Sequence, residues 1–447
     1  MAKFQAVPAL AFSVGDASGR QHVYEKGLQT MGAKLPMASS SKFPASLAVA
    51  SVIESGYLTF DTPVSAVFPW WTSDVSDTRK RHLVTLRHLL TMTSGLVEQE
   101  SHSSTPCMHD PSSYLPDDCA HQIYAAGPWN AMPGTQWSYN NLHLQIAGAM
   151  AARAANLTVG EMLERHLIRK LGLSSTSWRH MHTNPLLAGG MVSSGTDYET
   201  ILQAVLAYRG WSPQTLQTME QDTYETFPGL EPAPNARDRG IECFGHYAMG
   251  LFLECPEQPW DEACRRMGVL GNPGAFGYWP VLNRRRRYYM QLVVHQDRHV
   301  SREMMKRLNL PSSVSGALPA MCVSPLRFAL TAAVEAAIGL PATDLWPRHL
   351  QLAPFPFNIL CDLVASAEVA DQQRAMAAAE GRQGASSAHV RHALARNASA
   401  RLAHGLAAGH KLHLRPNERA MCARRPEDRS TETSFNLPAD GARDSGG

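Results

Sequence analysis

The sequence has no run of about 18 apolar residues, which is the length that a membrane-spanning helix requires. Its most apolar stretch, residues 328–340, is shorter and is interrupted by Glu335. An excess of charge of one sign is also missing, because 41 basic residues balance 39 acidic ones and the formal net charge is +2. This balance gives no electrostatic reason to expect a nucleic acid or an anionic membrane surface as the main partner.

Metal-binding spacing is absent as well, since the sequence contains no CxxC pair and no cluster of histidines. We therefore expect no metal site. The hydrophobic content of 44% and the charged content of 18% are typical of a globular protein with a core. A length of 447 residues leaves room for one large domain with extensions or for two domains.

A signal peptide is not recognisable either, because residues 1–8 lead directly into a strand-like pattern. This favours an intracellular protein, or a chain whose natural start lies elsewhere. The eight cysteines indicate the opposite compartment, since Cys107 and Cys119 bracket one polar segment and Cys255 and Cys264 bracket another. Such local disulfides are typical of exported proteins, and free cysteines are the alternative. The compartment stays open.

Strand patterns occur at both ends of the first 300 residues, and helical patterns lie between them. A hairpin is predicted around residues 15–19, and the later patterns that follow it are helical at 44–54, 83–92, 142–155 and 197–208 and extended at 247–253, 275–282 and 288–294. This order predicts an α/β domain with an α+β arrangement. Its antiparallel sheet would be assembled from both ends of the domain and flanked by helices, with a separate helical subregion.

The character of the sequence changes near residue 311. We expect one domain over residues 1–310, a helical extension over 311–370, and a disordered tail over 371–447, where Ala, Arg, Gly and Ser dominate. The alternative is a helical accessory domain over about residues 320–380. The basic run 284–287 lies in the turn of the last predicted hairpin, so we interpret it as a solvated tip rather than a nucleic-acid site.

A serine and a lysine separated by two residues stand at the start of the first predicted helix, in Ser39-Ser40-Ser41-Lys42. At this spacing the two side chains lie one turn apart on the same face, so that the amine lies beside the Ser39 hydroxyl. The helix N-terminus adds a positive partial charge where a serine anion would develop. Alone, the pattern also describes a serine-rich helix cap with a solvated lysine.

Two further motifs carry groups that acyl transfer requires. In Tyr139-Asn140-Asn141, a tyrosine near a lysine is suited to act as base or proton relay, and Asn141 is suited to hold a substrate amide or the lysine. In the third motif, residues 272–277, Gly274 lets backbone approach a substrate, and the N–H of Ala275 would polarise an acyl oxygen. Each motif alone is equally compatible with an ordinary turn.

Taken in order, these motifs and the segments between them resemble the serine β-lactamase-related family, which includes class C β-lactamases, D-alanyl-D-alanine carboxypeptidases and related esterases. Residues 84–96, VTLRHLLTMTSGL, are close to the family pattern ITLRHLLTHTSGL. The other similar segments are 37–43, 56–64, 133–141 and 188–194. The resemblance covers roughly residues 7–300 and implies a β-lactamase/transpeptidase-like fold of the kind found in penicillin-binding proteins.

The resemblance implies a serine hydrolase that needs no cofactor and acts on a small-molecule or peptide substrate through an acyl-enzyme. It implies Ser39 as nucleophile, Lys42 as its partner, and Tyr139 as general base or relay. Asn141 would bind the substrate and hold the network together. The acyl oxygen would lie between the N–H groups of Ser39 and Ala275.

The third motif departs from the family pattern, because Asn272 stands where the family usually has lysine or histidine. Asn272 and Gly274 are expected at the substrate-binding edge, but an amide there neither recognises a substrate carboxylate nor keeps the tyrosine acidic as a cation would. We therefore favour an ester over an amide or a β-lactam. The alternative is a catalytically inactive binding or scaffold protein, and the oligomeric state stays open.

Overall fold

The computed structural model describes residues 7, 9–97, 105–232, 246–254 and 262–296, together with 326, 327, 330, 331 and 333–338. Its strands are β1 (Leu10–Asp16), β2 (Gly19–Lys26), β3 (Lys34–Pro36), β4 (Gln136–Trp137), β5 (Ser177–Trp178), β6 (Met191–Ser194), β7 (Glu231–Pro232), β8 (His246–Tyr247), β9 (Phe252–Glu254), β10 (Val269–Gly271), β11 (Trp279–Asn283) and β12 (Tyr288–Val293).

The α-helices are α1 (Lys42–Glu54), α2 (Leu86–Leu90), α3 (Pro106–His109), α4 (Pro116–Ala126), α5 (Leu142–Ala154), α6 (Val159–Leu163), α7 (Arg169–Leu171), α8 (Gly195–Leu206), α9 (Pro213–Met219), α10 (Thr223–Thr226) and α12 (Glu262–Met267). Short 3-10 turns are η1 (Ala38–Ser41), η2 (Val64–Ala66), η3 (Arg81–Leu83) and η5 (Pro111–Ser113). Between α6 and α7 lies the π-helical turn η6 (Glu164–Ile168).

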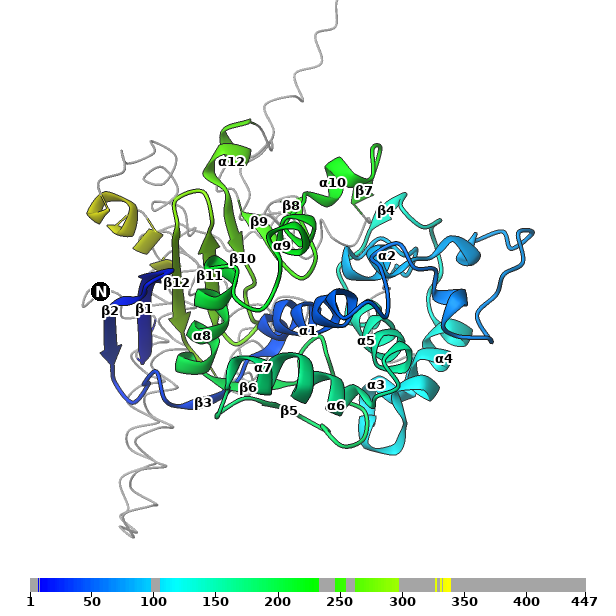
Figure 1. The fold of residues 1–447 in the computed structure, drawn as a ribbon, viewed down its shortest axis with the longest axis horizontal. Coiled ribbons are helices and arrows are strands. Elements are labelled where there is room, and N and C mark those ends of the chain that lie inside the picture. Colours follow the sequence, from blue (N-terminus) through cyan, green and yellow to red (C-terminus); the bar gives the residue numbers. More distant parts are fainter. Residues whose placement is uncertain are drawn as a thin grey trace, which may run out of the picture.

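The main sheet runs in the order β2-β1-β12-β11-β10-β9-β8. Every neighbouring pair is antiparallel. The first strand pairs with the last one, with Ala11 opposite Val293, and Figure 1 shows these distant segments side by side. The predicted assembly of the sheet from both ends of the domain is therefore confirmed.

Both faces of the sheet are covered, because the side chains of a strand point alternately to its two faces. In β12, Tyr289 and Val293 belong to the large core that also contains α1, α5 and α8. Tyr288, Met290 and Leu292 belong to a second core on the other face. The predicted α/β architecture of an antiparallel sheet flanked by helices is observed.

The second core includes a helical segment from within residues 326–338. Its buried apolar side chains are Leu326, Leu330 and Val334. Arg327 of this segment forms a fully buried ion pair with Glu254 of β9, and Glu254 also accepts a 2.8 Å hydrogen bond from Trp279 Nε1. The segment thus contributes to the core, and the rest of the predicted extension and tail lies outside the described residues.

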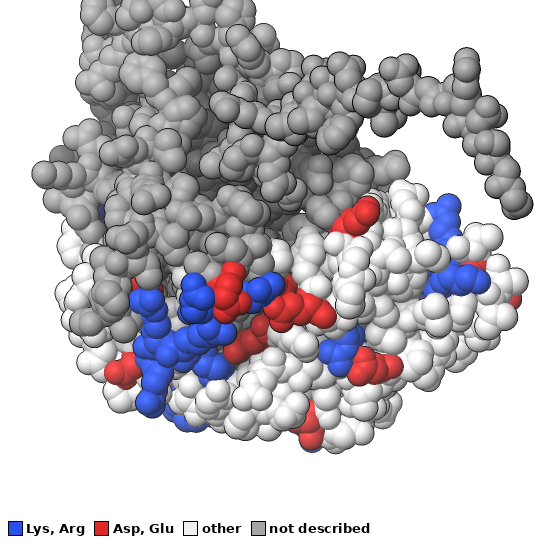
Figure 2. Space-filling model, turned by 90° about the horizontal axis from the view of Figure 1, so that it is seen from above, with Lys and Arg blue, Asp and Glu red and all other residues white. Residues whose placement is uncertain are grey.

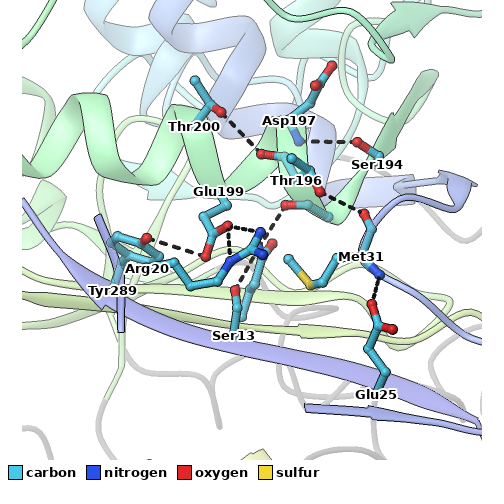
Figure 3. A network of polar contacts seen from close by, with 12 residues as sticks. Ser13, Arg20, Glu25, Met31, Ser194, Thr196, Asp197, Glu199, Thr200 and Tyr289 are labelled. Carbon is cyan, nitrogen blue, oxygen red and sulfur yellow. Dashed lines mark hydrogen bonds and ion pairs between the residues drawn. The ribbon is translucent and has the colours of Figure 1, made fainter. Parts of the chain in front are cut away.

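On the opposite face, a polar network attaches α8 to the sheet (Figure 3). Glu199 of α8 pairs with Arg20 of β2 and accepts a 3.3 Å hydrogen bond from Tyr289 Oη. Ser194 caps the N-terminus of α8, where its Oγ accepts the Asp197 N–H at 3.1 Å. The Glu199 contacts attach α8 to β2 and β12 of the main sheet.

The helical subregion lies beside the sheet, with α2, α3, α4, α5 and α6 grouped beyond α1 (Figure 1). Helix α5 is buried along most of its length, as its apolar sequence predicts. Cys107 and Cys119 form the first of the two predicted disulfides, which joins α3 to α4. For the second predicted pair, Cys264 is disulfide-bonded, but Cys255 lies outside the described residues.

Two predicted strands differ in detail. The expected strand over 247–253 is a hairpin of β8 and β9, because Gly250 adopts a left-handed conformation with φ of 82° between them. The expected strand over 275–282 begins only at Trp279, because residues 275–277 form a turn. Strand β10 is too short to be recognised by periodicity.

Two arginines of the basic run in the β11–β12 turn form ion pairs with acidic residues of other segments. Arg284 pairs with Glu220 at 2.6 Å, and Arg286 pairs with Glu335 at 3.0 Å. Figure 2 shows basic and acidic side chains lying next to one another on this face rather than forming a field of one sign. This pairing supports the interpretation as a hairpin tip.

Candidate active site

The predicted nucleophile segment forms the 3-10 turn η1, which connects β3 to α1. Ala38, immediately before Ser39, has a φ of 47°, a region that non-glycine residues rarely occupy. The turn is held because the Met37 N–H donates to the Met191 carbonyl at 2.9 Å and the Ser40 N–H donates to the Met37 carbonyl at 3.1 Å. Such local backbone strain persists only where the surroundings fix it, and it is common at functional sites.

The three consecutive serines have different surroundings. Ser39 is partly exposed, whereas Ser40 and Ser41 are fully buried. Ser40 Oγ donates to the Asn272 carbonyl at 2.6 Å, and Ser41 Oγ donates to the Ala38 carbonyl at 2.6 Å. Two of the hydroxyls therefore hold the turn together, and Ser39 alone of the three presents its side chain to solvent.

Lys42 begins α1 and is completely buried. Its Nζ lies 3.2 Å from Ser39 Oγ, 2.9 Å from Asn141 Oδ1 and 3.0 Å from the Ala188 carbonyl oxygen. An ammonium group has three N–H donors and no acceptor, so three oxygen partners are the environment that a charged lysine requires. The predicted one-turn spacing thus places the amine beside the Ser39 hydroxyl.

Tyr139 lies between β4 and α5, with the centre of its ring 4.7 Å from Lys42 Nζ. Burial raises the pKa of the Tyr139 phenol to about 12, and a hydrogen bond with Ser39 acts in the opposite direction. At neutral pH the phenol is therefore protonated in the resting protein.

The two asparagines after Tyr139 have separate tasks. Asn141 is the N-cap residue of α5, and its side-chain oxygen accepts from Lys42. Asn140 is buried, where its Nδ2 donates to the Leu96 carbonyl at 2.9 Å and its Oδ1 accepts the Leu142 N–H at 3.0 Å. Asn140 therefore fixes the loop, and this fixes the positions of Tyr139 and Asn141.

The third motif packs directly against the η1 turn. A Cβ atom added to Gly274 would lie 2.4 Å from the Met37 carbonyl oxygen and 3.0 Å from Ser40 Oγ, so only glycine allows this approach. The N–H groups of Ser39 and Ala275 have no hydrogen-bond acceptor among the described residues. Two unengaged donors on adjoining segments are what an oxyanion site requires, and that role stays a prediction.

Asn272 is 1% exposed. Its backbone carbonyl accepts the hydrogen bond from Ser40 Oγ, so the residue stabilises the η1 turn that carries Ser39. A direct contact between its amide and a substrate stays a prediction.

Several residues around this site were not singled out from the sequence. The Ala188 carbonyl is a partner of Lys42, and the only sequence signal for it was the similar segment 188–194. Tyr198 Oη donates to the Ser40 carbonyl at 2.8 Å from the far side of the turn. Trp137, Tyr247 and Phe252 pack around Tyr139, and no local pattern indicates that these separate segments meet.

The arrangement supplies a hydroxyl, an adjacent amine and phenol, and two backbone donors, which together are the groups that acyl transfer uses. Within the described part of the chain, no group of three His, Cys, Asp or Glu side chains is placed to hold a metal. No described helix has both the length and the apolar character needed to cross a membrane.

Comparisons with known proteins agree with this arrangement. A family model described as Beta-lactamase matches residues 2–311. The curated Beta-lactamase of Providencia stuartii is 25% identical over 186 residues, which are 39% of this chain and 43% of that protein. The match therefore spans less than half of that relative's length.

Two solved structures share the fold. A candidate beta-lactamase from Bacteroides dorei DSM 17855 has a TM-score of 0.53 and 23% identity, covering 65% of this chain and 86% of that one. The octameric penicillin-binding protein homologue from Pyrococcus abyssi has a TM-score of 0.53 and 16% identity, covering 78% of each chain. Because the family model covers more than half of the sequence, the chain belongs to the beta-lactamase family and has its serine hydrolase fold.

Proposed function

We propose that this protein is a serine hydrolase that forms an acyl-enzyme on Ser39 and favours ester substrates. The observation that carries the proposal is the Ser39 hydroxyl, which is partly exposed and lies 3.2 Å from the Nζ of the buried Lys42. The Asn141 and Ala188 oxygens hold that amine in place. A nucleophile beside an oriented basic group is the arrangement that covalent acyl transfer requires.

In the first step, Ser39 Oγ attacks the carbonyl carbon and its proton passes to the Lys42/Tyr139 pair. The N–H groups of Ser39 and Ala275 bind the negative oxygen of the tetrahedral intermediate. The leaving alcohol takes the proton from the pair, and the acyl group stays on Ser39. Water then attacks the acyl-enzyme and gives a proton to the same pair. As the bond between the acyl carbon and Ser39 Oγ breaks, the pair returns that proton to Ser39 Oγ and the acid is released.

The charges of the pair set its pH dependence. With a charged Lys42 and a neutral Tyr139, both groups of the resting pair are protonated, so the pair has to lose one proton before it can act as a base. It becomes competent when it loses that proton, and the apparent pKa of this loss belongs to the pair rather than to either residue. We therefore expect kcat/KM to rise as the pH rises through that value.

Substrate preference follows from the third motif. A cation at position 272 would attract the carboxylate of a β-lactam or of a D-alanyl peptide, but Asn272 carries no charge and is buried. A neutral ester needs no such cation. This reasoning favours small esters over carboxylate-bearing substrates.

The test is hydrolysis of p-nitrophenyl acetate and butyrate beside nitrocefin, with the wild type, Ser39→Ala and the control Ser55→Ala. Ser55 is an exposed serine at the other end of α1, so its loss leaves the site intact. Turnover of the esters that Ser39→Ala abolishes and Ser55→Ala keeps would support the proposal. Absence of turnover by folded protein would point to the binding or scaffold alternative.

A further inference from the structure

Three aromatic side chains form a cluster around the candidate base, Tyr139. The ring of Tyr139 has its centre 5.5 Å from Phe252, 5.9 Å from Tyr247 and 6.2 Å from Trp137. Trp137 and Tyr247 lie 5.6 Å apart, and Tyr247 meets the Tyr139 ring edge-on at 85°. Tyr139 is therefore enclosed by rings that keep water away from one side of it.

Two members of this cluster carry hydrogen-bond donors that have no acceptor in the part of the chain that the structure describes. Trp137 is 2% exposed and Tyr247 is 1% exposed. Neither Trp137 Nε1 nor Tyr247 Oη has a hydrogen-bond partner among the described residues. A buried donor without an acceptor destabilises a fold by about 1–3 kcal/mol, so two of them beside a reactive group require an explanation.

We propose that Tyr247, assisted by Trp137, is a positioning residue that stabilises the anionic form of Tyr139 while the pair acts as a base. The inference rests on the proposed function, because only that function requires Tyr139 to lose its proton. In the resting protein the phenol of Tyr139 is neutral and the donors are idle. When charge develops on Tyr139, the idle donors gain an acceptor, so they favour the reactive state over the resting one.

The missing cation of the third motif makes such help necessary. Burial raises the pKa of Tyr139 to about 12, and Asn272 supplies no positive charge against this effect. Among the described residues, the titratable groups that face Tyr139 are Lys42 of α1 and Tyr247 of β8. His143 of α5 lies near Lys42, and burial followed by the Lys42 charge lowers its pKa to about 3, so it stays neutral.

Tyr247 itself keeps its proton throughout. Burial raises the pKa of Tyr247 well above its ordinary value, and negative charge on Tyr139 raises it further. Its O–H therefore remains a donor when Tyr139 becomes anionic. The transferred proton is the one from Ser39, which moves to the pair and then to the leaving group, so Tyr247 gains and loses nothing.

The experiment is the pH dependence of kcat/KM and of Ser39 labelling by a fluorophosphonate, measured for the wild type, Tyr247→Phe and Trp137→Phe. Tyr247→Phe removes one oxygen and keeps the ring. The control is Tyr289→Phe, which removes another buried tyrosine hydroxyl far along the sheet, where it contacts Glu199. Thermal unfolding of each variant is measured alongside.

We expect Tyr247→Phe to move the midpoint of the pH profile upward by about one unit, which is about a tenfold loss at a fixed lower pH. The limiting rate at high pH and the unfolding temperature should be kept, because the Tyr247 O–H donates to no acceptor among the described residues of the resting fold. Trp137→Phe should shift the profile in the same direction, and Tyr289→Phe should not shift it.

A profile for Tyr247→Phe that superimposes on that of the wild type would overturn the inference and leave the proposed function standing. A rise in KM without a pH shift would also overturn it, because it would assign the hydroxyl to substrate binding. Wild-type protein without Ser39-dependent labelling would remove the proposed function and this inference with it.

Discussion

Replacement of Arg327 by methionine should destabilise the fold strongly, because it leaves a buried carboxylate without its partner. Arg327 is 0% exposed and Glu254 is 2% exposed, so neither charge is solvated by water. Removing one partner of such a pair typically costs about 3–5 kcal/mol, whereas replacing both often costs little. We expect Arg327→Met to lose about that much unfolding free energy near neutral pH.

The loss should depend on pH in a defined direction. Burial raises the pKa of Glu254 above 4.5 even with Arg327 beside it, and removing that cation should raise it further. A carboxyl group whose pKa is raised by folding stabilises the fold below its unfolded pKa, and this stabilisation is lost as the pH rises through the folded value. The penalty should therefore be smaller in acid than at neutral pH.

Urea unfolding of the wild type, Arg327→Met and the double variant Glu254→Gln/Arg327→Met tests this reasoning at several pH values. The double variant buries no charge, so it should recover most of the stability that the single variant loses. A single-variant penalty under about 1 kcal/mol, or one that does not change with pH, would refute the assignment of a buried charge.

Three further outcomes are expected. A chain that ends at residue 311, the boundary favoured by composition alone, should bind more of an apolar dye and aggregate more than the full chain, because it uncovers the core face that Leu326, Leu330 and Val334 cover. Burial lowers the pKa of His143 to about 3 and of His88 to about 4, both below the ordinary value of 6.5, so the stability that these neutral histidines contribute should be fully present above pH 6.5 and fall as the pH is lowered toward the two values. The unfolding free energy, measured in urea at several pH values, should therefore depend less on pH in His88→Asn than in the wild type, and an equal dependence would contradict the reasoning. Asn141→Leu should lower kcat by about tenfold or more and also lower the unfolding temperature, because the buried Lys42 loses the side-chain oxygen that accepts from it and orients it; unchanged kcat would contradict that task.

The parts of the site that depend on local geometry are those that the sequence predicts well. Ser39 and Lys42 meet because one helical turn separates them, and Asn141 begins the next buried helix as its position before an apolar run indicates. The fold class follows from the order of periodic segments. The first disulfide follows from two cysteines bracketing a short polar segment.

The rest depends on contacts between distant segments. The spacing to Lys42 distinguishes Ser39 from Ser40, but no local pattern predicts that Ser40 is buried, because its hydroxyl donates to the Asn272 carbonyl, 232 residues further along the chain. The β8–β9 turn requires glycine at position 250 partly because α1 lies close by, where a Cβ atom would be 3.0 Å from the Lys42 carbonyl oxygen. The charged residue Arg327 is tolerated in a core because its guanidinium forms an ion pair with the Glu254 carboxylate, which lies far from it in the sequence.

The pairing of β1 with β12 has a consequence for synthesis. A growing chain leaves the ribosome from its N-terminus, and domains fold as units. Ala11 has no strand partner on that side until Val293 has emerged, and Ser40 has no acceptor at Asn272 until the same late stage. Non-local pairing of this kind also slows folding. A nascent chain therefore carries the Ser39 segment for most of its translation without a completed site, and any activity would begin only when the end of the domain is made.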